Sequence, residues 1–144
     1  MKFDIRSLVL LCAIIAGAGC ASRPPSGFEV RTLDGVAYSR AFDEAEMAIA
    51  HHFDIRSSDR DNGLIATRYS SEKSIDGIIK VRAMAILSEA KAGQATTVHL
   101  KVVRERFWEK WEFDHDLTTQ VDLEGYDRVL ANLILDEIQT RSAQ

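Results

Sequence analysis

Two short clusters contain histidine, the side chain that most often binds metals or transfers protons near neutral pH: His51-His52 and Asp114-His115-Asp116. Neighbouring side chains on a helix point about 100° apart, so we expect His51 and His52 to be poorly placed to share one metal ion. On a strand, Asp114 and Asp116 lie on one face and His115 on the other. We therefore predict no metal site. A hydrolase that uses His115 with one of these aspartates is the alternative.

A third cluster, Asp59-Arg60-Asp61, has the composition of a carboxylate pair adjusted by an arginine, as acid–base catalysis uses. It precedes Asn62-Gly63, and aspartate and asparagine in such a stretch form turns by hydrogen bonding to their own backbone. We interpret the cluster as part of a turn. The sequence contains no glycine-rich phosphate loop and no serine in the setting of a nucleophile elbow. We therefore expect a protein that is not an enzyme and needs no cofactor.

Three aromatic residues, Trp108, Trp111 and Phe113, lie close together in the sequence and form the candidate interface. Aromatic side chains anchor contacts between proteins. They also fill the edges of small cores, which is the alternative reading of this group. Residues 108–121 show neither a clear helical nor a clear strand pattern, so their conformation is not predicted.

The N-terminal segment indicates export. Lys2 and Arg6 precede an uncharged run, Leu8–Gly19, that is too short to span a bilayer and is typical of a signal peptide. We therefore predict a signal peptide over residues 1–19. Residues 16–18 also fit the site of an ordinary signal peptidase, and cleavage there would release a soluble secreted protein.

The small residues Ala18 and Gly19 before Cys20 resemble the lipobox of bacterial lipoproteins, although Gly17 stands where that family usually has leucine. The resemblance implies that Cys20 becomes the first mature residue and carries a thioether-linked diacylglyceryl group and an amide-linked acyl chain such as palmitate. Two or more acyl chains give stable attachment to a membrane. Ala21 replaces the aspartate that retains such proteins in the inner membrane, which implies the periplasmic face of the outer membrane.

Composition narrows the partners further. The 144-residue chain carries 18 lysines and arginines against 22 acidic residues, a net charge of −4. Nucleic acid selects basic surfaces, so we expect no nucleic-acid partner. The same balance gives the folded part no general attraction to anionic lipid. Cys12 and Cys20 are the only cysteines, so we expect no disulfide and no thiolate metal site in the folded part.

The chain divides into a signal peptide, a lead-in and one domain. Residues 20–35 hold the predicted lipidated cysteine and a tether, because Pro24-Pro25 favours an extended backbone. Residues 36–144 are long enough for a single domain. Apolar spacing predicts helices over residues 36–52 and 123–141, and strands over residues 53–57, 64–69, 78–88 and 96–107.

We expect a two-layer α+β fold, in which the N-terminal and C-terminal helices cover one face of a four-stranded antiparallel meander. Asp122 is the expected N-cap of the last helix. That helix has a wide apolar stripe, formed by Tyr126, Val129, Leu130, Leu133, Ile134 and Ile138. The other sheet face would stand in water, with Lys80, Arg82, His99, Lys101 and Glu105 on it.

Residues 41–69 combine a helix, an alternating strand and a turn, and end in Gly63-Leu64-Ile65-x-Thr67-Arg68. This stretch resembles a unit of small bacterial envelope lipoproteins of the planctomycete type. It is more distantly similar to the helix-grip domains of the C lipoprotein in the outer-membrane β-barrel assembly machine. The resemblance implies an envelope location and an α+β fold, and it supplies no catalytic residue.

Together these features predict a non-enzymatic, lipid-anchored envelope protein that binds or scaffolds another envelope component. Its contact surface would be the exposed sheet face or the aromatic segment at 107–113. The alternative is a carrier of a small apolar ligand, held in a groove between the sheet and the C-terminal helix.

Overall fold

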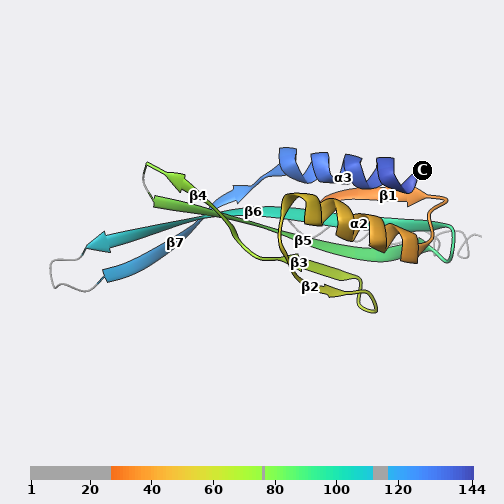
Figure 1. The fold of residues 1–144 in the computed structure, drawn as a ribbon, viewed down its shortest axis with the longest axis horizontal. Helices are drawn as coiled ribbons and strands as arrows, with labels where there is room; N and C mark the ends of the chain where they lie inside the picture. The colour runs from red at the N-terminus through yellow and green to blue at the C-terminus, as the bar shows by residue number, and fades with distance from the viewer. Residues whose placement is uncertain (1–26, 76, 112–116) are drawn as a thin grey trace, which may run out of the picture.

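The computed structural model describes residues 27–75, 77–111 and 117–144, which form two helices and a mostly antiparallel sheet of seven strands (Figure 1). The helices are α2 (Tyr38–His52) and α3 (Arg128–Ser142). The strands are β1 (Glu29–Asp34), β2 (Ile55–Asp59), β3 (Leu64–Thr67), β4 (Ser70–Ser74), β5 (Gly77–Lys91), β6 (Ala95–Trp111) and β7 (Leu117–Tyr126). The expected α+β class is confirmed, whereas the four-stranded meander is wrong.

The hairpin of β5 and β6 forms the centre of the sheet and explains the additional strands. β5 has 15 residues and β6 has 17, so each is long enough to pair with two partners along one edge. β3 and β4 pair with β5, while β1 and β7 pair with β6. An unpaired edge leaves backbone donors and acceptors open, which favours added strands even where the sequence is polar. β4 therefore lies between the predicted strands 64–69 and 78–88, where no strand is expected, and β1 lies in the expected lead-in before residue 36.

Both helices pack on one face of the sheet, as expected. α2 contributes Phe42 and Ile49 to the core, and α3 contributes Ile134, Leu135 and Ile138. The central strands present alternate buried residues to them, as the apolar spacing that predicts strands 78–88 and 96–107 requires: Val81, Ala83, Ala85, Leu87, Val98, Leu100 and Val102. The side chains that would line a ligand groove under α3 thus pack against one another.

The last helix begins later than the sequence indicates, so Asp122 as its N-cap is wrong. Asp127 caps α3, because its Oδ1 accepts a hydrogen bond from the backbone N–H of Leu130 at 3.0 Å. β7 continues to Tyr126, which pairs with Val103 of β6. The open edge of β6 extends the strand into the expected first turn of the helix.

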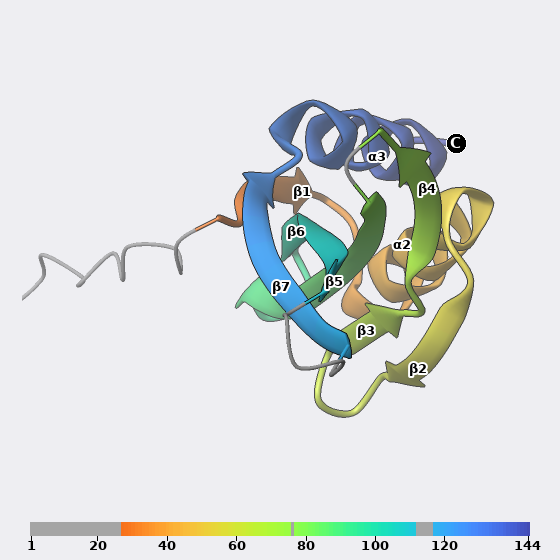
Figure 2. The ribbon, with the colours of Figure 1, turned by 90° about the vertical axis from the view of Figure 1, so that its left-hand side faces the viewer.

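Only part of the sheet lies under the helices. The part in which β4 and β7 pair with the central hairpin extends past both helices (Figure 1). Seen along the long axis, β4 and β7 flank β5 and β6 on opposite sides (Figure 2). Trp108 lies in this extension with 37% of its surface exposed, and Trp111 is the last residue of β6. Phe113 lies outside the described residues.

Candidate functional site

Several predicted site residues fall outside the part of the chain that the structure describes. These are Cys20, Phe113 and the Asp114-His115-Asp116 cluster. Lipid attachment at Cys20, an interface through the aromatic segment and a hydrolase around His115 therefore stay predictions.

The Asp59-Arg60-Asp61 cluster forms a turn, as predicted. The Asp59 carboxylate accepts hydrogen bonds from the backbone N–H of Asn62 at 3.1 Å and from its side-chain amide at 2.8 Å. These bonds, led by the side-chain amide, lower the pKa of Asp59. Arg60 forms an ion pair with Asp43 of α2. Asp59 and Arg60 thus each have a partner within the protein.

His51 and His52 converge on one carboxylate, which corrects the expectation that they point too far apart. His51 Nδ1 lies 3.3 Å from Glu137 Oε1, and His52 Nε2 lies 3.1 Å from Glu137 Oε2. The two rings use different nitrogens: Nδ1 is near the ring's attachment point and Nε2 is at its far end. This difference in reach compensates for the divergence of neighbouring residues, and α3 supplies the shared carboxylate from across the helix pair.

Glu137 is held by more than the two imidazoles. Arg141, one turn later on α3, places Nε at 2.9 Å and Nη2 at 2.8 Å from Glu137 Oε1. Burial raises the pKa of Glu137, but the hydrogen bonds from Arg141, His52 and His51 outweigh it, and the net shift is downward. The Glu137 carboxylate is therefore ionised and accepts hydrogen bonds on both oxygens.

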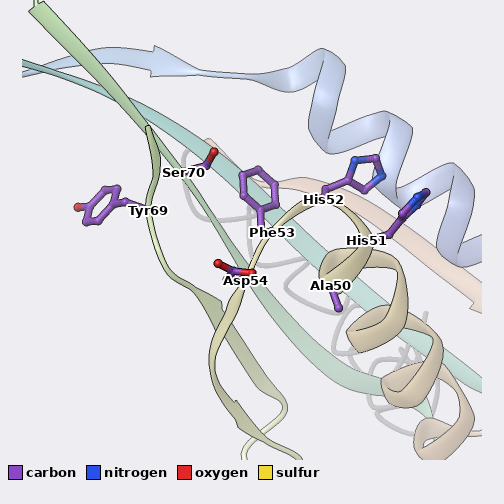
Figure 3. A pocket seen from close by; sticks show the side chains of 7 residues that line it. All are labelled: Ala50, His51, His52, Phe53, Asp54, Tyr69 and Ser70. Carbon is purple, nitrogen blue, oxygen red and sulfur yellow. The ribbon is translucent and has the colours of Figure 1, made fainter. Parts of the chain in front are cut away.

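A hollow adjoins this cluster where α2 ends and β4 begins. Figure 3 shows that both imidazoles point toward α3, whereas Tyr69 points away from them. The exposed fraction of the side chain is 67% for His51, 23% for His52 and 21% for Glu137, so solvent reaches the cluster from the His51 side. Seven residues line the hollow: Ala50, His51, His52, Phe53, Asp54, Tyr69 and Ser70.

A second hollow, which we call the arginine hollow, lies on the sheet face opposite the helices. It is lined by Arg56, Thr67, Arg68, Tyr69 and Arg82. Arg56 comes from β2, Arg68 follows β3, and Arg82 comes from β5, so three sheet positions supply its cations. The Arg82 guanidinium lies 4.9 Å from the centre of the Tyr69 ring. The Tyr69 hydroxyl donates to Glu105 Oε2 at 2.7 Å, and that bond is the main cause of the raised pKa of Tyr69.

The uncovered sheet face is less hydrated than predicted. Its expected polar residues are all partly buried rather than fully exposed: Lys80, Arg82, His99, Lys101 and Glu105. Aromatic rings cover them, since Lys80 lies 4.1 Å from the centre of the Phe107 ring and Lys101 lies 4.8 Å from that of Phe28. Exposed aliphatic side chains stand between these clusters at Val30, Leu64 and Met84. The face therefore combines cations, aromatic rings and apolar area.

The sequence alone did not indicate Glu137, Arg141, Arg56 or Arg68 as site residues. An i, i+4 pair of glutamate and arginine is visible in the sequence, but its proximity to His52 depends on how α3 crosses α2. Alternation along each strand could have indicated that Arg56 and Arg82 both point away from the core side of the sheet. Their convergence also needs the pairing of β2, β3 and β5.

Comparison of the chain with known proteins gives no guide to the site. No protein-family model matches the chain, and neither a curated protein nor a solved structure is significantly similar to it. Among the described residues, no helix has the length and apolar character that crossing a membrane requires.

Proposed function

We propose that this chain is a lipid-anchored, non-enzymatic binding module of the cell envelope, and that its uncovered sheet face binds an acidic segment of another envelope protein. The arginine hollow carries this proposal. Three guanidinium groups and a tyrosine line one hollow in a chain whose net charge is negative. A local basic surface on an acidic protein attracts an acidic partner while the rest of the surface repels it.

Two of the three arginines are available to a partner. Arg82 is balanced in part by Glu105, whose Oε1 lies 3.3 Å from Arg82 Nη2. Arg56 and Arg68 form no ion pair with any other residue in the described ranges. Because a guanidinium binds a carboxylate through two parallel hydrogen bonds, these two positions suit aspartate or glutamate side chains.

The surroundings of the hollow favour a protein segment over a lipid surface or a sugar polymer. Arginine, tyrosine and methionine beside apolar area is the composition of protein interfaces. β2, which carries Arg56, is the last strand of the sheet and pairs only with β3 among the described strands, so its other edge is open. An extended peptide could add to that edge through backbone hydrogen bonds and place its acidic side chains in the hollow.

The predicted anchor fits this role. Lipid on Cys20 would leave seven residues before Phe28, and seven extended residues reach roughly 20–25 Å. The sheet would then stand close to a membrane and meet partners that share it, which raises their effective concentration.

The test is capture of a partner from detergent-solubilised membranes with the full-length chain as bait. We expect a stoichiometric protein to bind the unaltered chain and to be released by salt. The double variant Arg56→Glu/Arg68→Glu should weaken its binding at least about tenfold, since each change replaces attraction with repulsion. Arg40→Glu on the exposed surface of α2 makes half of this charge change elsewhere and should leave binding intact.

Cross-linking and mass spectrometry should place an acidic segment of the captured protein beside Arg56 or Arg68. Equal loss in the Arg40→Glu variant, or full retention in the double variant, would contradict the proposal. Binding to vesicles of anionic lipid without any protein partner would assign the face to the membrane instead.

A further inference from the structure

The end of α2 and the middle of α3 hold three side chains that metals bind well. The ligand atoms of His51, His52 and Glu137 all lie within 4.8 Å of one another. Two imidazoles and one carboxylate form a ligand set that proteins use for zinc, with a fourth position left for water. We propose that this cluster binds a divalent transition-metal ion, with zinc as the best fit.

The distances agree with tetrahedral coordination. With zinc about 2.0–2.1 Å from each nitrogen or oxygen, neighbouring ligand atoms stand about 3.3 Å apart. His51 Nδ1 lies 3.4 Å from Glu137 Oε2, and His52 Nε2 lies 3.1 Å from the same oxygen. Only the separation of the two histidine nitrogens has to shorten. The largely exposed His51 side chain has room to rotate for this adjustment.

Arg141 competes with a metal ion for the Glu137 carboxylate. The carboxylate has two oxygens, however, so one can bind Arg141 and the other the metal. Both contacts from Arg141 go to Glu137 Oε1. The other oxygen, Oε2, faces His52 and is free to coordinate a metal. Arg141 would then keep its hydrogen bonds on Oε1 and orient the ligand from outside, as groups behind a metal ligand commonly do.

Metal binding requires a rearrangement of protons but no other chemistry. An ionised carboxylate only accepts hydrogen bonds, so without metal the N–H groups lie on His51 Nδ1 and His52 Nε2. These same nitrogens must offer a lone pair to zinc. Each neutral ring therefore moves its proton to its other nitrogen through solvent, and a doubly protonated ring releases one proton. Acid should consequently oppose zinc binding.

The experiment titrates zinc chloride into the purified full-length chain in detergent, with binding measured by calorimetry and thermal unfolding. We expect one site, and a rise in melting temperature of about 10 °C when free zinc is one hundred times Kd. His52→Ala and Glu137→Gln should each raise Kd at least about tenfold, since loss of even an outer-shell partner costs that much.

His115→Ala is the matched control, because Asp114 and Asp116 flank that histidine in the sequence and form the rival ligand set. It should leave zinc affinity unchanged. Loss of binding in His115→Ala with retention in His52→Ala would overturn the proposal, and so would an unaltered chain whose melting temperature zinc does not change.

Nitrogen NMR of the unaltered chain keeps the proposal testable even if a variant fails to fold. Zinc should shift the resonances of His51 Nδ1 and His52 Nε2 and move the N–H to the opposite nitrogens. Zinc-induced shifts confined to the other histidines would assign the metal elsewhere.

Discussion

His99 is a polar side chain whose surroundings do not satisfy its hydrogen-bonding capacity. It lies on the uncovered sheet face, where its Nδ1 atom is buried and has no hydrogen-bond partner among the described residues. The ring packs edge-on against Phe28, with 6.5 Å between the ring centres. Burial lowers the pKa of His99 below the ordinary value of 6.5, because the charged imidazolium is poorly solvated there.

This shift predicts how stability depends on pH. A lowered pKa means that the unfolded state binds more protons than the folded state, so the free energy of unfolding falls as pH drops below 6.5. The loss stops growing once pH is below the folded-state pKa. We expect the His99→Phe variant to lose less stability than the unaltered chain between pH 7 and pH 5. Urea unfolding at both pH values measures this difference, and two parallel curves would contradict the assignment.

At the scale of elements, α3 shows that an apolar stripe does not establish which of its members are buried. Ile134 and Ile138 are fully buried, while Val129 is 81% exposed and Leu133 is 51% exposed. The helix begins at Arg128, so Tyr126 belongs to β7 and does not extend the stripe. The buried side of α3 instead includes Ala131 and Leu135, so it is displaced around the helix from the stripe that the sequence suggests.

The substitution of Ile138 by alanine tests this buried side of α3. We expect Ile138→Ala to cost about 2–5 kcal/mol, because a fully buried side chain leaves a cavity. Val129→Ala shortens another β-branched residue on the same helix, and should change the free energy of unfolding by less than about 0.5 kcal/mol. Chemical denaturation measures both. Similar costs for the two variants would show that the N-terminal turn of α3 is also packed.

At the scale of the whole molecule, the two faces of the sheet differ in their charge and in whether helices cover them. The helices shield one sheet face, while the other collects the arginine hollow, the aromatic rings and the exposed aliphatic residues. This mixture of charge, aromatic rings and apolar area on one face is the basis of the proposed binding function. The negative net charge of the whole chain therefore does not describe the charge of this face.

The proposed anchor also belongs to this scale, since it determines where the face can act. Growth with a palmitate analogue should label the unaltered chain and leave Cys20→Ser unlabelled and released from membranes. Cys12→Ser changes the chain's other cysteine and should keep the label. An unlabelled mature protein that begins at residue 19 would show that the ordinary signal peptidase cleaves it.

Local patterns in the sequence determined the α+β class, the approximate places of both helices, the buried positions of the central strands and the turn at Asp59. Each depends on contacts between residues a few positions apart, which repeat with the period of a helix or strand. The charged turn is predictable for the same reason, because Asp59 and Asn62 bond to each other locally.

Only the tertiary structure decided the strand count and the candidate sites. β4 and β7 exist because the long hairpin offers unpaired edges, a requirement imposed by partners distant in the chain. The meeting of His52 with Glu137 joins residues 85 positions apart, and the arginine hollow needs the register of three strands. Such contacts follow from how elements cross and pair, and no local period in the sequence encodes that geometry.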